Sequence, residues 1–206
     1  MSKTVIINTG NGNFLSVKRA VEKYNKNVKI SHDPNEILSA SKIILPGVGA
    51  FKDSVSFLKK KKIFEIIKEI SNQKPILGIC LGMQLLFENS NEFGLCEGLN
   101  LIKGNIRPLP DQKINGINYK IPNIGWYKLE NNSKNLKYLN EKKDDFYFIH
   151  SFYAKDVKNE NLLAFYKFGN IKVPAIVKQK NIIGCQFHPE KSRAPGLNII
   201  KHFLES

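Results

Sequence analysis

Long apolar runs, paired cysteines and clustered arginines are all missing from this chain of 206 residues. No stretch of eighteen apolar residues occurs, and the short apolar run near the N-terminus lacks the length of a secretory signal, which argues against a membrane span and against export. The three cysteines, Cys80, Cys96 and Cys185, form no C-x-x-C pair and lack zinc-ligand spacing. We therefore expect a cytoplasmic protein with no disulfide, no metal and no other cofactor.

Acidic residues are too few to balance the basic ones, since 32 Lys and Arg face 18 Asp and Glu and leave a net charge of +14. Such a charge can attract nucleic acid or membrane phosphate. The lysines are scattered, however, and no aromatic residues alternate with a basic stretch as in a base-stacking platform. We expect no nucleic acid or membrane partner, with the run 59–62 covering a solvated helix face and an acidic partner surface left open as an alternative.

The length fits a single domain, residues 1–206, and the hydrophobic content of 42% suits a soluble core. In the first hundred residues short apolar strands alternate with amphipathic helices, which is typical of a parallel sheet covered on both faces. Strands are expected at residues 5–7, 28–30, 42–45 and 75–79. Helix faces are expected from apolar spacing at Val17, Ala20, Val21 and Tyr24, and at Ile63, Ile66, Ile67 and Ile70.

Asp33-Pro34-Asn35-Glu36 predicts a helix start, with Asp33 as the cap and Glu36 answering it from the third helical position. Residues 92–145 are rich in Asn, Gly and Pro and are expected to form short antiparallel strands and loops. Further strands are expected at 146–149, 173–178 and 182–187, before a closing helix that carries Leu197, Ile200 and Leu204. The fold class is therefore α/β, with a mostly parallel central sheet, helices on both faces and a mixed or antiparallel extension.

A cysteine flanked by two glycines is the sharpest local signal. In Gly78-Ile79-Cys80-Leu81-Gly82, Cys80 lies between an apolar strand and a helical run. A nucleophile on a tight strand-to-helix turn needs small residues two positions away on either side. There the helix N-terminus favours a thiolate, and backbone N–H groups are at hand for an oxyanion. Taken alone, the motif fits a buried, inert cysteine equally well.

A thiol nucleophile needs a base, and the base needs a partner that fixes its tautomer. His188-Pro189-Glu190 offers both just beyond a predicted strand, and an extended segment would place His188 and Glu190 on the same side. Of the other histidines, His32 and His202 are expected at the surface, and His150 is a secondary candidate. Cys185 is expected in the core, and Cys96 has no base near it in sequence.

With both motifs in view, the chain resembles the class I glutamine amidotransferases of the triad type and, within them, the glutaminase subunits of imidazole glycerol phosphate synthases. The resemblance covers the whole chain and rests on several motifs, namely Gly12-Asn13 with Ser16-Val17, Leu45 to Gly49, Gly78 to Leu86, Gly125-Trp126, Tyr147 to Ser151 and Gln186 to Ser192. It implies that the chain hydrolyses glutamine to glutamate and ammonia and supplies the ammonia to a partner. That partner is a (β/α)8-barrel cyclase in a heterodimer of histidine biosynthesis, which stimulates a slow basal glutaminase.

The resemblance also implies roles for individual residues. Cys80 is the nucleophile, His188 the acid and base, and Glu190 the group that orients His188. The oxyanion is received by backbone groups of Leu81 and of Val48 or Gly49. Glutamine is recognised by Gln84, Glu92, Ser151 and Phe152, and an ordinary position on a helix surface remains the less favoured alternative for Gln84 and Glu92. The Gly10 to Asn13 loop lacks the third glycine of a dinucleotide site and is expected to contact the partner instead.

Three positions depart from the histidine-pathway pattern. The usual Pro-His-x-Gly-Trp-Asn is here Pro122-Asn123-Ile124-Gly125-Trp126-Tyr127, and Phe152 replaces a common Tyr. These departures leave open an alternative, a glutaminase subunit that feeds a sugar amidotransferase of bacterial surface-polysaccharide assembly. Two rivals from other classes are an inactive assembly subunit, which should have lost a triad member, and a stand-alone cysteine hydrolase with another substrate.

Overall fold

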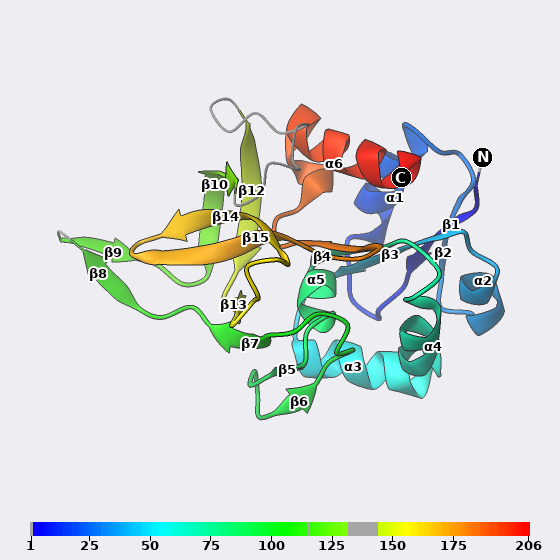
Figure 1. The fold of residues 1–206 in the computed structure, drawn as a ribbon, viewed down its shortest axis with the longest axis horizontal. Coiled ribbons are helices and arrows are strands. Elements are labelled where there is room, and N and C mark those ends of the chain that lie inside the picture. The colour runs from blue at the N-terminus through cyan, green and yellow to red at the C-terminus, as the bar shows by residue number, and fades with distance from the viewer. Residues whose placement is uncertain (1, 115, 132–143) are drawn as a thin grey trace.

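The computed structural model describes residues 2–114, 116–131 and 144–206 and is built on one eight-stranded sheet (Figure 1). The strand order is β11-β14-β15-β16-β4-β3-β1-β2. Five of these strands form the parallel part, β1 (Thr4–Ile7), β2 (Val28–Ser31), β3 (Lys42–Gly47), β4 (Ile76–Cys80) and β16 (Ile182–Cys185). β1, β3 and β4 are buried at every residue, as expected for strands covered on both faces.

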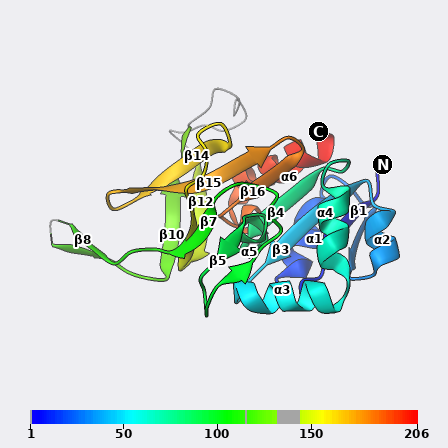
Figure 2. The same cartoon turned by 60° about the horizontal axis from the view of Figure 1, so that its bottom comes forward.

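Two hydrophobic cores lie on opposite faces of this sheet, because successive strand residues point to opposite sides. Val5 and Ile7 pack into one core with helices α2 (Pro34–Leu38), α3 (Phe51–Lys60), α4 (Ile63–Ile70) and α5 (Leu81–Leu85). Ile6 packs into the other core with α1 (Phe14–Glu22) and α6 (Arg193–Glu205). Figure 2 shows these two groups of helices on either side of the sheet. The predicted fold class is confirmed.

The antiparallel part of the structure extends the sheet and adds smaller pieces beside it. β11 (Glu130–Asn131), β14 (Leu162–Phe168) and β15 (Ile171–Gln179) continue the main sheet, with β15 antiparallel to β16. β10 (Asn123–Lys128) and β12 (Asp145–His150) form a two-stranded ribbon. The remaining strands are β5 (Asn89–Ser90), β6 (Cys96–Glu97), β7 (Asn105–Pro108), β13 (Phe152–Lys155) and the β8–β9 hairpin (Gln112–Ile114 and Ile117–Tyr119).

Several details differ from the sequence predictions. The segment after β3 holds two helices rather than one, because Lys62 adopts a left-handed conformation (φ 59°) between α3 and α4. Asp33 does cap α2 through the Asn35 N–H, but Glu36 does not answer it. The Glu36 carboxylate instead pairs with Lys3 and Lys29. β14 was not anticipated, and β7, which lies in the region expected to form antiparallel strands, pairs in parallel with β5.

Candidate active site

Cys80 ends β4 at a turn that only glycine neighbours can accommodate. Its own backbone is in an unusual conformation, with φ 53° and ψ −111°, and α5 begins at the next residue. A Cβ atom on Gly82 would lie 1.6 Å from the Leu45 carbonyl oxygen, and one on Gly78 would lie 2.8 Å from Gly82 O. Such a strained turn holds the nucleophile at the end of the strand and directs the first N–H groups of the helix toward it.

His188 reaches the same edge of the sheet because β16 runs parallel to β4, with Cys185 opposite Ile79. The His188 N–H donates to the Tyr147 carbonyl (3.0 Å), which ties this segment to the ribbon. The chain does not continue extended, as the sequence suggested, since Pro189–Lys191 forms a turn of 3-10 helix. That turn brings the carboxylate back, and His188 Nδ1 lies 2.8 Å from Glu190 Oε1.

The His188–Glu190 pair is almost completely removed from solvent, with side-chain exposures of 3% and 1%. Burial lowers the pKa of His188, but hydrogen-bonding and charge interactions with Cys80 and with Glu190 outweigh burial and raise the pKa above the ordinary histidine value. The thiol is close enough for this effect, although Nε2 has no well-directed hydrogen-bond partner among the described residues. A proton is therefore favoured on the imidazole beside the sulfur.

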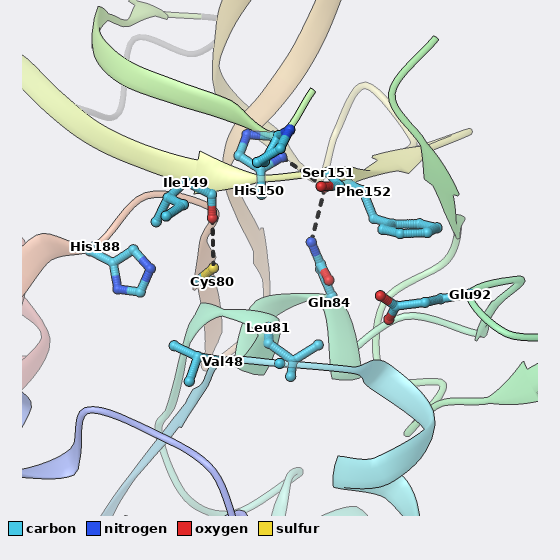
Figure 3. A pocket seen from close by; sticks show the side chains of 12 residues that line it. Val48, Cys80, Leu81, Gln84, Glu92, Ile149, His150, Ser151, Phe152 and His188 are labelled. Atoms are coloured by element: carbon cyan, nitrogen blue, oxygen red, sulfur yellow. Dashed lines mark hydrogen bonds between the residues drawn. The ribbon is translucent and has the colours of Figure 1, made fainter. Parts of the chain in front are cut away.

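A cavity of about 270 Å³ opens over the thiol, and Figure 3 shows the side chains around it. Its walls contain every residue to which the sequence assigned a catalytic, oxyanion or glutamine-binding role except Glu190, which lies behind His188. His150, the secondary candidate, also lines it, as do Pro122 and Ile149, to which the sequence assigned no role. The full set is Val48, Gly49, Cys80, Leu81, Gln84, Glu92, Pro122, Ile149, His150, Ser151, Phe152 and His188.

Gln84 and Glu92 are not the ordinary helix-surface residues that the sequence left as an alternative. Gln84 is only 5% exposed, and its amide nitrogen donates to the Phe152 carbonyl (3.0 Å). Glu92 lies beside α3 rather than on it, and its Oε2 accepts a hydrogen bond from the Phe51 N–H (2.7 Å) at the start of that helix. The other carboxylate oxygen of Glu92 places negative charge at the cavity wall, where it can bind the ammonium group of an amino acid.

The loop after β3 forms the mouth of the cavity. Val48 is 39% exposed, and Gly49 has φ 92° with open space around it. Gly47, by contrast, packs against Leu81, so that backbone freedom is concentrated at the outer end of the loop. Thr9 of the N-terminal loop donates to the Pro46 carbonyl (3.2 Å), which places the Gly10–Asn13 loop next to this mouth.

His32, His202 and Cys185 lie where the sequence predicted. His32 and His202 are exposed, Cys185 is fully buried, and Cys96 is in the short strand β6. His150 is buried beside the cavity, where burial lowers its pKa to about 4 despite a hydrogen bond to the Phe152 carbonyl. Within residues 2–114, 116–131 and 144–206, no three His, Cys, Asp or Glu side chains gather as metal ligands. No helix of those ranges is long and apolar enough to span a membrane.

Comparisons with known proteins agree with this arrangement. Residues 5–206 match the family described as glutamine amidotransferase class-I. The chain is 40% identical to imidazole glycerol phosphate synthase subunit HisH 1 of Legionella pneumophila (strain Paris), over the full length of both. It is 43% identical to subunit HisH of Lactococcus lactis subsp. lactis (strain IL1403), over 100% of this chain and 99% of the relative.

Solved structures share the fold at much lower sequence identity. A crystal structure of a glutamine amidotransferase aligns with a TM-score of 0.74 and 18% identity, covering 98% of this chain and 97% of the other. PurLQS from Thermotoga maritima aligns with a TM-score of 0.67 and 16% identity over the whole of both chains. These likenesses support the architecture of the sheet and helices described above.

Proposed function

Because this chain belongs to the class I glutamine amidotransferase family and, within it, to the HisH subunits of imidazole glycerol phosphate synthase, we propose that its glutaminase activity depends on Cys80, His188 and Glu190. The whole chain, residues 1–206, acts as one cytoplasmic glutaminase domain. It hydrolyses glutamine to glutamate and ammonia and supplies the ammonia to a cyclase subunit in histidine biosynthesis.

The reaction follows from the positions of these groups. The Cys80 thiolate attacks the carboxamide carbon of glutamine, and the backbone N–H groups of Leu81 and of Val48 or Gly49 receive the oxyanion. His188 donates its proton to the departing nitrogen, which leaves as ammonia. A γ-glutamyl thioester remains on Cys80. His188 then takes a proton from water, and the resulting hydroxide attacks the thioester. Glutamate leaves with release of one proton to solvent, which restores the Cys80 thiolate beside a protonated His188. Glu190 keeps the imidazole oriented throughout.

The observation that carries this proposal is the meeting of three independent features in one cavity. A cysteine on a strained strand-to-helix turn lies beside a histidine whose far nitrogen is held 2.8 Å from a buried carboxylate. The cavity of about 270 Å³ offers Gln84, Glu92, Ser151 and Phe152 to the amino-acid end of the substrate. All three triad members are present, which argues against an inactive assembly subunit.

The face beside the cavity mouth supports a protein partner. On the β10–β12 ribbon, Ile124 lies opposite Ile149 and Trp126 opposite Tyr147, and three of these side chains are 38–56% exposed, as is Val48 at 39%. Exposed apolar groups of this kind are typical of interaction surfaces. We propose a (β/α)8-barrel cyclase subunit in a heterodimer, seated over this mouth. Ammonia is a nucleophile only while unprotonated, so that a route sealed from bulk water explains the pairing.

The departures at residues 123 and 127 do not favour the alternative of a sugar amidotransferase. The Asn123 and Tyr127 side chains point inward from the ribbon and hydrogen-bond to each other, so that the outer face keeps Trp126 and its neighbours. The relatives reported above carry the name of the imidazole glycerol phosphate synthase subunit. Both considerations support the histidine pathway as the destination of the ammonia.

Labelling with an electrophilic glutamine analogue tests the proposal. We expect covalent modification at Cys80 alone, mapped by mass spectrometry, with none in Cys80→Ala. Cys96→Ser serves as a matched control that should label normally. Addition of the candidate cyclase subunit and its acceptor ligand should accelerate the labelling. A labelling rate that the cyclase does not change would favour a sugar amidotransferase as the partner. Absence of labelling at Cys80 in every condition would overturn the catalytic assignment.

A further inference from the structure

A chain of buried hydrogen bonds leads away from the cavity, and its directions can be assigned from chemistry. His150 Nδ1 lies 2.8 Å from the Phe152 carbonyl oxygen. A carbonyl only accepts, so Nδ1 must carry the proton of the neutral ring. His150 Nε2 is then an acceptor, and it takes the hydroxyl proton of Tyr166 at 2.8 Å. One tautomer of His150 satisfies both neighbours.

The same chain continues into the ribbon. The Asn123 amide nitrogen donates to the Tyr166 hydroxyl oxygen (2.8 Å), and the Asn123 amide oxygen accepts the Tyr127 hydroxyl proton (2.5 Å). Asn123, His150 and Tyr166 are at most 6% exposed, so water cannot replace these bonds without rearrangement. Asn123 and Tyr127 lie on β10, on the inward side of the strand whose outward side carries Ile124 and Trp126.

In the other direction, the series of hydrogen bonds leads from His150 to Cys80. The Phe152 carbonyl accepts a second hydrogen bond, from the Gln84 amide nitrogen at 3.0 Å. The same amide nitrogen donates its other proton to Gln186 Oε1 (3.1 Å), and Gln186 Nε2 lies 3.8 Å from Cys80 Sγ. These contacts fix which way both amides point. An unbroken series of contacts therefore joins the inner side of the ribbon to the thiol.

We propose that His150 is a positioning residue for glutamine binding, which holds the Phe152 carbonyl and through it the Gln84 side chain, and which connects that pocket to Asn123 and Tyr127 beneath the ribbon. The inference rests on the proposed glutaminase function and deepens it. All three residues line the cavity, but both ring nitrogens of His150 are taken up by the Phe152 carbonyl and the Tyr166 hydroxyl, so His150 acts on the substrate through Phe152 and Gln84. A partner bound to the outer face of β10 and β12 thus contacts the strands that carry Asn123, Tyr127 and His150 on their inner face. These inner residues position the side chains of the glutamine pocket.

The surroundings of His150 keep its imidazole ring in the neutral form that this hydrogen-bond pattern needs. Burial lowers the pKa of His150 to about 4, and the nearby His188 charge adds to the effect, although the bond to Phe152 opposes it. The ring therefore stays neutral at physiological pH. A neutral ring is required by the bonding pattern, because a second proton on Nε2 would face the Tyr166 hydroxyl proton. The surrounding rings of Phe148 and Tyr166 restrict the imidazole further.

Kinetics of two substitutions test the role. His150→Asn retains a donor near the position of Nδ1, whereas His150→Leu removes it. We expect the KM for glutamine to rise about ten-fold or more in His150→Leu, since the buried Phe152 carbonyl loses one of its two donors and no longer holds the Gln84 side chain in a fixed position. His150→Asn should recover most of that loss. In both proteins kcat should change much less than KM, because neither the triad nor the oxyanion groups are altered.

A second pair of substitutions tests the same role without changing His150, in case the His150 variants do not fold. Tyr166→Phe removes the hydroxyl that donates to His150, whereas the matched control Tyr153→Phe removes a hydroxyl with no hydrogen bond to any described residue. Tyr166→Phe should raise KM and Tyr153→Phe should not, with thermal melting followed in parallel. Equal KM values across wild type and all variants would overturn the positioning role. An inactive wild-type protein would instead overturn the proposed function, so the two failures are distinguishable.

Discussion

Replacement of His150 by Asn should change how the stability of the protein depends on pH. His150 is neutral in the folded protein down to about pH 4, whereas the ordinary histidine value is 6.5. Between these two pH values the unfolded chain binds a proton at this residue and the folded protein does not. Stability that is fully present above pH 6.5 is therefore lost as the pH falls toward 4, and a side chain that does not titrate removes this loss.

The size of the effect follows from the two pKa values. One pKa unit corresponds to about 1.4 kcal/mol, so the whole shift is worth about 3 kcal/mol. At pH 5.5 the wild-type protein should already have lost about 1 kcal/mol through this residue relative to pH 7.5, and by pH 4.5 between about 2 and 3 kcal/mol. Titrating groups that do not interact with His150 are present in both proteins and cancel in the difference, whereas the His188 charge acts on His150 directly and is part of the effect.

Urea denaturation followed by circular dichroism at pH 7.5, 5.5 and 4.5 provides the measurement, because the free energy of unfolding is obtained at each pH for both proteins. We expect His150→Asn to be the less stable protein at pH 7.5, where it lacks the bond from Tyr166, and the gap to narrow or reverse at pH 4.5. Two curves that stay parallel within about 0.5 kcal/mol would refute the assignment of a buried neutral His150.

Three further changes have defined outcomes. Glu190→Gln should lower kcat about 100-fold or more with little change in KM for glutamine, since the imidazolium loses its buried counter-charge; near-normal steady-state rates would remove Glu190 from the triad. Gly82→Ala should abolish activity and lower the melting temperature, because its Cβ would overlap the Leu45 carbonyl; an unchanged melting curve would show that the turn can relax. Trp126→Ala should weaken binding of the cyclase by about 2 kcal/mol, roughly 30-fold, with little loss of stability, and unchanged affinity in titration calorimetry would move the interface away from the ribbon.

The parallel half of the fold was predictable because its strands are short apolar runs that are buried on both faces. The meeting of Cys80, His188 and Glu190 was predictable for a related reason, since glycines at fixed positions and a histidine directly after a strand reflect local backbone geometry. The structure confirms the helices on both faces, and the prediction of one helix after β3 was wrong because Lys62 looks like any other surface lysine. β14 was missed because its polar Lys167 and its three aromatic residues show no regular alternation.

The hydrogen-bond chain through His150 could not be predicted from the sequence. Asn123, Tyr166 and His150 come from three different strands, and no local pattern relates them. Tyr166 belongs to the missed strand, and Asn123 appeared only as a departure from the pattern of related subunits. Their pairing depends on how the ribbon packs on the main sheet. Gln186 was visible beside His188, but only the packing of α5 against β16 reveals its contact with Cys80.

The position of β16 between β4 and β15 governs when the activity can arise during synthesis. The parallel layer formed by β1 to β4 is complete once residue 80 has left the ribosome, and its contacts are comparatively local. Such a nascent chain carries the thiol but lacks its base and carboxylate, which are added more than a hundred residues later. The last central strand to be synthesised is thus also the one that delivers His188. A nascent chain that ends before residue 188 therefore holds the thiol without the imidazole, and the three side chains can meet only after β16 and the turn that follows it have been synthesised.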